Sequence, residues 1–155
     1  VNGLLAVKSN YAYQNDIYLD IDFDAPLSEA DISDQDMVSI VSNIIDNAFE
    51  AMCSDTRDYK KVLSVLSYSE NDNLFIAVSN NGPQIPESNL SKVFNQKYTT
   101  KTTSVGRGYG LFIVKQIIEK NGGEITVTST RENTEFLVKL KKKVKEKVSD
   151  SDFFN

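Results

Sequence analysis

The stretch Val105-Gly106-Arg107-Gly108-Tyr109-Gly110-Leu111 places three glycines in alternation directly before the amphipathic segment 112–119. Glycine has no Cβ, so the backbone N–H groups of such a stretch can approach a ligand closely. A helix N-terminus carries about half a positive charge, which favours anions such as phosphate. The stretch therefore indicates a phosphate-binding loop at the start of a helix, with a flexible helix-entry loop as the alternative.

Three familiar glycine-rich loops do not fit this stretch. A dinucleotide-binding fold needs a strand directly before the glycines, whereas 99–104 is a polar run. A phosphate-loop NTPase needs Gly-Lys-Ser/Thr at the end of the loop, whereas Gly110 is followed by Leu111. A protein-kinase loop lies in a hairpin and is followed by a strand lysine, whereas a helix is predicted here. The sequence therefore excludes these three classes of nucleotide site.

The composition is that of an ordinary globular chain. Of its 155 residues, 40% are apolar and 25% are charged, which suits one domain with a core of its own. The net charge of −5 argues against nucleic acid as a partner, and no stretch is apolar and long enough to span a membrane. The chain has no histidine, which excludes histidine acid–base catalysis by these residues, and its one cysteine excludes an internal disulfide.

Hydrophobic periodicity predicts two principal helices. An apolar stripe at three- and four-residue steps predicts a helix over about 33–53, with Ser33 or Asp34 as its N-cap. The glycine run should begin a second helix that ends at 121–123, and 1–13 is interpreted as the end of a further helix. The stripe consists of Met37, Ile40, Val41, Ile44, Ile45, Ala48 and Met52.

Apolar alternation predicts five strands, at 17–23, 62–68, 74–79, 124–129 and 134–140. The second and third should form a hairpin around a turn at 70–73, and the last two should form another. The polar segment 87–106 is longer than most connections and is predicted to be a functional lid. We therefore expect an α/β (α+β) two-layer sandwich, with a mixed, mostly antiparallel five-stranded sheet covered on one face by about three helices.

Asn43 and Asn47 are one helical turn apart beside the apolar stripe. A nucleoside triphosphate binds with Mg²⁺, a hard cation that takes oxygen ligands and keeps several waters. An amide oxygen on a rigid helix suits that ion, because phosphates and waters supply the remaining ligands. Asn47 is therefore a candidate metal ligand, and a surface asparagine pair is the alternative.

Four motifs carry a resemblance to a known family. They are 43–51 (NIIDNAFEA), 78–86 (VSNNGPQIP), 93–101 (VFNQKYTTK) and 106–111 (GRGYGL). In this order they resemble the N box, the first glycine box, the F box and the second glycine box of the GHKL ATPase superfamily. Within it, the chain is similar to the catalytic ATP-binding domain of sensor histidine kinases over about residues 15–141. The resemblance implies a Bergerat fold with an ATP lid.

The resemblance also implies a division of the chain and roles for its residues. Residues 1–14 would end an upstream dimerisation and phosphoacceptor helix, 15–143 would be the ATP-binding catalytic domain, and 144–155 a polar tail. The implied catalytic residues are Asn43, Asn47 and Arg107, with Asn47 as the Mg²⁺ ligand. The residues implied to bind ATP are Asn80, Gly82, Ile85, Phe94, Lys97, Lys101, Gly106, Arg107, Gly108, Gly110, Leu111 and Thr134.

Most of these ATP-binding residues fall into three groups. Asn80, Gly82 and Ile85 would form the adenine pocket, with Thr134 supporting the base through its hydroxyl. Gly106, Gly108 and Gly110 would hold the phosphates. Phe94 would anchor the lid, and Lys101 and Arg107 would pair with phosphate oxygens.

Three positions depart from the family pattern. Asn80 stands where the family has an adenine-reading aspartate, Gln84 replaces a glycine, and Glu50 stands where many histidine kinases have a basic residue. An amide accepts a hydrogen bond less strongly than a carboxylate, so we expect weaker or less selective ATP binding. Asn80 is also similar to the residue of peptide-pheromone quorum-sensing kinases, which suggests that class.

The implied function is phosphoryl transfer from Mg-ATP to a histidine of an upstream dimerisation domain, and then to a response regulator. The chain would be the cytoplasmic domain of a bacterial membrane receptor, monomeric when isolated and homodimeric in the full receptor. Alternatives are an ATPase of the gyrase, chaperone or mismatch-repair type, a serine kinase of the anti-sigma type, and a degenerate nucleotide-binding module. The ATPases use a glutamate where this chain has Asn43, which cannot act as a general base.

Overall fold

The computed structural model describes residues 1–96 and 110–144 of the chain. The predictions for 97–109 and 145–155, which include most of the lid and the polar tail, lie outside the described residues. The elements in chain order are α1 (Asn2–Gln14), β1 (Ile17–Phe23), η1 (Leu27–Glu29), α2 (Asp34–Cys53), β2 (Lys61–Glu70), β3 (Asn73–Asn80), α3 (Glu87–Leu90), α4 (Gly110–Lys120), β4 (Glu124–Ser129) and β5 (Thr134–Lys141).

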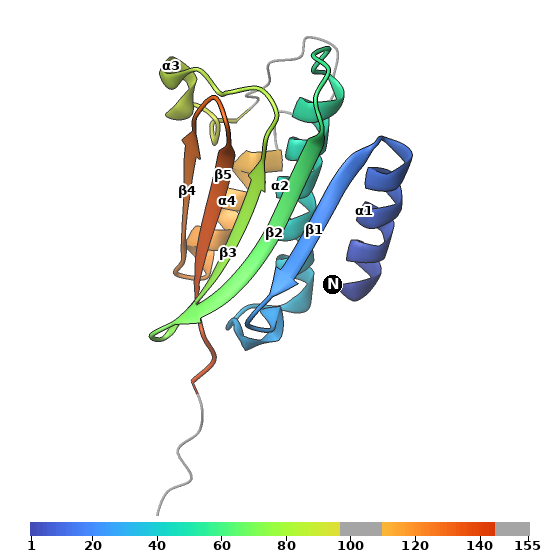
Figure 1. Cartoon of the computed structure of the whole chain (residues 1–155). Helices are drawn as coiled ribbons and strands as arrows, with labels where there is room; N and C mark the ends of the chain where they lie inside the picture. The colour runs from blue at the N-terminus through green and yellow to red at the C-terminus, as the bar shows by residue number, and fades with distance from the viewer. Residues whose placement is uncertain (97–109, 145–155) are drawn as a thin grey trace, which may run out of the picture.

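The strands form one sheet in the order β1-β2-β3-β5-β4. β1 and β2 run parallel, and every other neighbouring pair is antiparallel. A parallel pair needs a long connection, and α2 lies within the one between β1 and β2. α2 and α4 cover one face of the sheet, while α1 lies beside β1 (Figure 1). The predicted sandwich with a mixed, mostly antiparallel five-stranded sheet is confirmed.

Alternate side chains of the strands fill the core between sheet and helices. On β3, Leu74, Ile76 and Val78 are buried, and the whole predicted stripe is buried on α2. Phe49 is buried as well, although the predicted stripe did not include it. Its ring centroid lies 4.7 Å from that of Tyr11, so Phe49 is a point at which α1 packs against α2.

Local hydrogen bonds and backbone angles explain where the two long helices begin and end. The Asp36 N–H donates to Ser33 Oγ at 3.1 Å, which makes Ser33 the N-cap of α2. After α4 ends at Lys120, Gly122 has a φ of +75°, a left-handed value that glycine adopts at low cost. Both ends lie where the sequence predicts them.

Two segments differ in detail from the prediction. Glu70 and Asn73, expected in the turn of the hairpin, are paired strand residues, so the turn is Asn71-Asp72. Asn71 has a φ of 55°, which asparagine tolerates better than most residues. The segment predicted to be a lid begins with the short helix α3.

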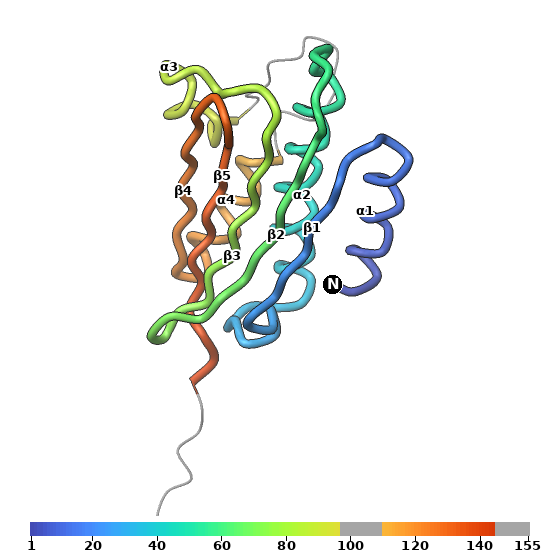
Figure 2. The backbone as a smooth tube through the Cα atoms, in the orientation of Figure 1, coloured from blue at the N-terminus to red at the C-terminus, as the bar shows by residue number. Residues whose placement is uncertain are grey.

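Four chain segments meet at one end of the molecule. The end of β3, the start of β5, the C-terminal end of α2 and the start of α4 lie together there (Figure 2). Asn80, the last residue of β3, is paired with Thr134, the first residue of β5. Three of the four sequence motifs therefore contribute residues to the same end of the fold.

Candidate functional site

A small pocket of about 80 Å³ lies at this end of the fold. Five predicted site residues line it, although they come from distant parts of the sequence: Asn47, Asn80, Ile85, Leu111 and Thr134. The other lining residues are Ala51, Pro83, Val93 and Phe136. The fold thus brings together the N box, the first glycine box, the F box and the last residue of the second glycine box.

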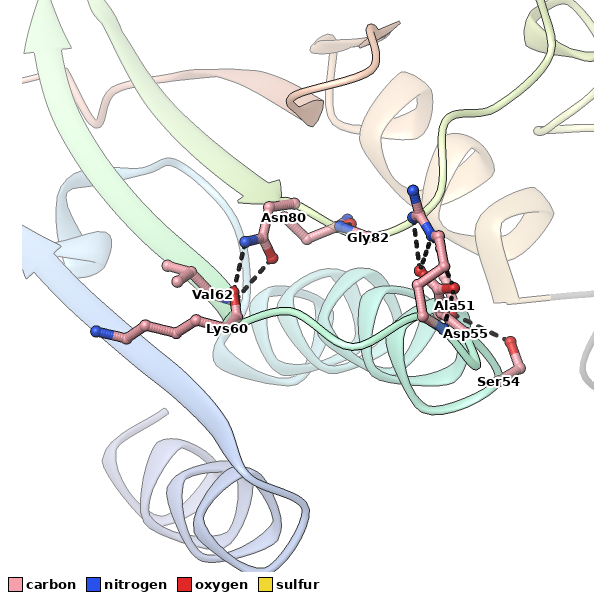
Figure 3. Close-up of polar contacts among 9 residues, drawn as sticks. Ala51, Ser54, Asp55, Lys60, Val62, Asn80 and Gly82 are labelled. Atoms are coloured by element: carbon pink, nitrogen blue, oxygen red, sulfur yellow. Dashed lines mark hydrogen bonds and ion pairs between the residues drawn. The ribbon is translucent and has the colours of Figure 1, made fainter.

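Asn80 closes a tight turn at the end of β3. It is 4% exposed, and its Oδ1 accepts a hydrogen bond of 2.9 Å from the Gly82 N–H. A Cβ on Gly82 would lie 2.9 Å from both Asn80 Oδ1 and Met52 Cγ, which is closer than Cβ atoms come to non-bonded atoms in proteins. Position 82 therefore requires glycine because no side chain fits there. Figure 3 places Asn80 and Gly82 beside the C-terminal end of α2.

Asn81 ties the end of β3 to the start of β2. Its Oδ1 accepts from the Val62 N–H at 2.8 Å, and its Nδ2 donates to the Lys60 carbonyl oxygen at 2.7 Å. This role of Asn81 is not predicted from the sequence, where it is only a member of the first glycine box. Its only signal is the Asn-Asn-Gly sequence at a strand end, which indicates a turn but not its partner.

A chain of hydrogen bonds links the other side of the pocket. The Ile85 N–H donates to Ser129 Oγ at 2.9 Å, and Ser129 Oγ lies 2.6 Å from Thr134 Oγ1. Thr134 is 3% exposed. The Thr134 hydroxyl, predicted to support the base, is therefore held in place by Ser129, which the sequence analysis did not identify. Ser129 stands at the end of β4, and sequence alone gives no sign that it faces Ile85.

Asn43 and Asn47 lie one turn apart on α2, as predicted. Asn43 Nδ2 donates to the Ser39 carbonyl oxygen at 2.7 Å, which orients its Oδ1 the other way. That Oδ1 lies 3.3 Å from the position of a Cβ on Gly110, so it faces the first residue of α4. Asn47 lines the pocket itself.

These asparagines fit a magnesium ion bound together with a nucleotide. In residues 1–96 and 110–144, no group of three or more histidine, cysteine, aspartate or glutamate side chains is placed to hold a metal. A cation here would therefore depend on amide oxygens, phosphate oxygens and water, a set that suits Mg²⁺. In that case Asn47, which lines the pocket, would be the ligand, and Asn43 Oδ1 would accept from a metal-bound water.

The remaining predicted residues lie around the pocket or outside the described residues. The Phe94 ring makes an edge-to-face contact with Phe136 at 6.1 Å between centroids, which attaches the segment after α3 to β5. Gly110 starts α4, whose N-terminal N–H groups favour an anion. Outside the described residues are Lys97, Lys101, Gly106, Arg107 and Gly108.

A charged cluster lies next to the C-terminal end of α2. Arg57 Nη2 lies 2.6 Å from Asp55 Oδ2, and this contact holds the pKa of the Asp55 carboxyl well below its usual range. The Arg57 guanidinium lies 5.3 Å from the centroid of the Tyr59 ring. Burial, followed by the influence of the nearby Asp55 carboxylate, raises the pKa of the Tyr59 hydroxyl to about 12. The Tyr59 oxygen lies 3.7 Å from the position of a Cβ on Gly82, so this cluster packs behind the pocket.

Comparison with known families gives one clear match. Residues 33–144 match the family model described as "Histidine kinase-, DNA gyrase B-, and HSP90-like ATPase". The segment contains every residue predicted to form the site. The match therefore covers the pocket and the elements that build it.

Two curated relatives are sensor kinases. One is the "Probable C4-dicarboxylate sensor kinase" of Halalkalibacterium halodurans, 42% identical over 113 residues, which are 72% of this chain and 21% of that protein. Another is "Sensor protein CitS" of Bacillus subtilis, 32% identical over 133 residues, which are 84% of this chain and 24% of that protein. The chain thus spans about a quarter or less of the length of these relatives.

A solved structure gives the same fold. The catalytic domain of histidine kinase ThkA superposes with a TM-score of 0.78 at 23% identity, over 91% of this chain and 89% of that one. The predicted peptide-pheromone class is not supported, because one of these relatives is named as a C4-dicarboxylate sensor kinase and neither name refers to a pheromone. The prediction depended on Asn80, and a single isosteric change at a pocket residue is too little to define a class.

In the described part of the chain, no helix has the length and apolarity to cross a membrane.

Proposed function

The chain belongs to the family of histidine kinase-, DNA gyrase B- and HSP90-like ATPases, and on that premise we propose that it serves a membrane sensor kinase that detects a C4-dicarboxylate or citrate. In that receptor it binds Mg-ATP and donates the γ-phosphate to a histidine. The names and the 42% and 32% identities of the two relatives support this sensor class. The pocket supports the chemistry.

The convergence of Asn47, Asn80, Leu111 and Thr134 on one pocket carries the proposal. We call Asn80, Gly82, Ile85, Ser129 and Thr134 the base end of the pocket, because Asn80, Ile85 and Thr134 line it and are hydrogen-bonded to Gly82 and Ser129. We call Asn43, Asn47 and Gly110 the metal end. The helix N-terminus at Gly110 favours phosphate at the metal end.

The metal end favours phosphoryl transfer to another nucleophile over hydrolysis. None of the described residues that line the pocket is an aspartate, glutamate or histidine. Asn43 is an amide whose nitrogen is already bonded to Ser39, so it cannot take a proton from water. A site of this kind positions the phosphates and stabilises their charge while the nucleophile comes from elsewhere. This argues against the gyrase-type ATPase alternative.

Magnesium would be held by Asn47, with Asn43 accepting from a bound water. When bound, the ion neutralises charge on the phosphate oxygens. The side chains of this chain then orient the phosphates against the start of α4.

The acceptor histidine lies outside this sequence, which contains none. We place it on an upstream dimerisation domain to which α1 leads, with a response regulator as the next acceptor. The full receptor would be a homodimer in the membrane, with this domain in the cytoplasm.

Calorimetry and a transfer assay test the proposal. Titration of the chain with Mg-ATP and Mg-ADP should give saturable binding of both, whereas no binding at millimolar nucleotide would favour a degenerate module. The full receptor, given ATP labelled in its γ-phosphate, should become labelled on histidine, a bond that is labile in acid and stable in base. Label that survives acid would instead support a serine kinase.

A further inference from the structure

Asn80 presents a fixed hydrogen-bonding polarity to the pocket. A backbone N–H can only donate, so the Asn80 atom 2.9 Å from the Gly82 nitrogen is the carbonyl oxygen. The other end of the amide is then its NH₂ group, which can only donate. An aspartate at this position would have an oxygen at both ends. The Asn-for-Asp difference therefore exchanges an acceptor for a donor on the side away from Gly82.

The surroundings oppose a flip of this amide. Gly82 is buried, and its N–H has Asn80 Oδ1 as its acceptor. A flip would place the NH₂ of Asn80 against that N–H and leave a buried donor unpaired. Asn80 itself is 4% exposed, with Thr134 opposite on β5, so it cannot rotate into solvent.

Among the described side chains that line the pocket, the polar groups other than Asn80 do not select a base. Of the described lining residues, Asn47, Asn80 and Thr134 are polar. Asn47 belongs to the metal end, one helical turn from Asn43. The Thr134 hydroxyl, paired with Ser129 Oγ at 2.6 Å, can act as donor or acceptor after rotation about its C–O bond. Of the described side chains in the lining, Asn80 is therefore the one whose polarity discriminates between purines.

Adenine and the oxopurines differ in the group that would meet Asn80. The exocyclic amino group of adenine donates, and two donors do not pair. The exocyclic carbonyl oxygen of hypoxanthine or guanine accepts, and it pairs with the NH₂ of Asn80. We propose that Asn80, held by the Gly82 N–H, makes this site bind an oxopurine nucleoside triphosphate at least as tightly as ATP. The inference rests on the proposed nucleotide-binding function.

Calorimetric titration with the magnesium complexes of ATP and ITP tests this, because the two differ only in the purine ring. For the wild-type chain, the Kd for ITP should be equal to or lower than that for ATP. In Asn80→Asp, the oxygen facing Gly82 is kept and the other end becomes an acceptor. We expect the ratio of the ITP and ATP dissociation constants to shift about tenfold toward ATP.

Asn71→Asp is the matched control. Asn71 is exposed and lies in the turn before β3, at the end of the strand opposite to Asn80. The substitution makes the same change of charge there, and aspartate also tolerates the observed φ of 55°. Its ratio should equal that of the wild type. The inference is overturned if the wild-type chain binds ATP more tightly than ITP, or if Asn80→Asp shifts the ratio by less than about threefold.

A second measurement needs no variant and guards against misfolding of Asn80→Asp. The triphosphate of purine riboside lacks the exocyclic group. The wild-type chain should bind ITP more tightly than this analogue, and it should bind ATP no more tightly than the analogue. If ATP binds more tightly than the analogue and ITP does not, the inference is overturned. If neither the wild type nor Asn80→Asp binds any of these nucleotides, the proposed function itself fails; ATP binding with a preference for ATP removes only the oxopurine inference.

Discussion

The base end and the metal end of the pocket are organised differently. At the base end, Asn80 is bonded to Gly82, and Ile85 is bonded through Ser129 to Thr134. At the metal end, Asn43 is fixed by one bond from its nitrogen, and within the described residues the Asn47 side chain makes no hydrogen bond. The base end is thus preorganised by the protein, whereas the oxygens of the metal end are left for a ligand.

This difference explains how one pocket combines selection and chemistry. A preorganised set of donors and acceptors discriminates between ligands, because a mismatched group leaves a buried partner unsatisfied. Oxygens without protein partners can instead coordinate an ion that arrives with the nucleotide. Substitutions at the base end should therefore affect folding and nucleotide binding together. Substitutions at the metal end should affect Mg-nucleotide binding and transfer with little effect on folding.

The largest expected effect is at the metal end. Asn47→Ala removes the proposed protein ligand of Mg²⁺, and phosphotransfer by the full receptor should fall about hundredfold or more. The melting temperature should stay within a few degrees of the wild type, because the Asn47 side chain has no hydrogen bond to lose among the described residues. Transfer at the wild-type rate would remove Asn47 from the metal site.

Gly82→Ala should have the next largest effect, at the base end. The added Cβ would lie 2.9 Å from Asn80 Oδ1 and from Met52 Cγ. We expect a loss of about 1–3 kcal/mol in the free energy of unfolding, measured by urea denaturation, together with weaker nucleotide binding.

Gly3→Ala is the matched control for that variant. No atom lies within 4 Å of a Cβ built on Gly3, which belongs to α1. Alanine should leave binding unchanged and raise stability by about 0.5–1 kcal/mol, the ordinary difference between the two residues in a helix. Equal effects of the two substitutions would refute the steric argument for Gly82.

Ser129→Ala should have the smallest of the three effects. It removes the acceptor of the Ile85 N–H and the partner of the Thr134 hydroxyl. We expect a loss of about 1–2 kcal/mol in the free energy of unfolding and a weaker affinity for nucleotide.

Ser33→Ala serves as the control for Ser129→Ala. It also removes a serine hydroxyl that accepts a backbone hydrogen bond, but at the N-cap of α2, the end of that helix away from the pocket. It should cost about 1 kcal/mol of stability and leave nucleotide affinity unchanged. If both variants changed stability alone, Ser129 would be a structural residue and not part of the base end.

Most of the secondary structure was predictable from the sequence because its causes are local. The stripe of α2 repeats at three- and four-residue steps, Ser33 caps the helix from three residues away, and Gly122 supplies the left-handed angle after α4. The predicted hairpin turn was wrong at Glu70 and Asn73, because pairing between the two strands holds these polar residues in the sheet.

The site was predictable in its members but not in its hydrogen bonds. The motifs supplied Asn47, Asn80 and Thr134, and the pocket contains them. The role of Ser129 was not predictable from the sequence, because its partner Ile85 is 44 residues away and a serine at a strand end has no distinctive pattern.

The sequence by itself determined the helices, the strands, the order of the motifs and the chemical types of the site residues, because periodicity, capping and residue identity are properties of short segments. Only the tertiary structure decided which way each amide points. The Gly82 N–H fixes the polarity of Asn80, and the Ser39 carbonyl fixes that of Asn43. Whether those amides then face a pocket depends on β3, β5, α2 and α4 meeting at one end. That meeting follows from burial of the shared apolar core, to which segments far apart in the chain contribute.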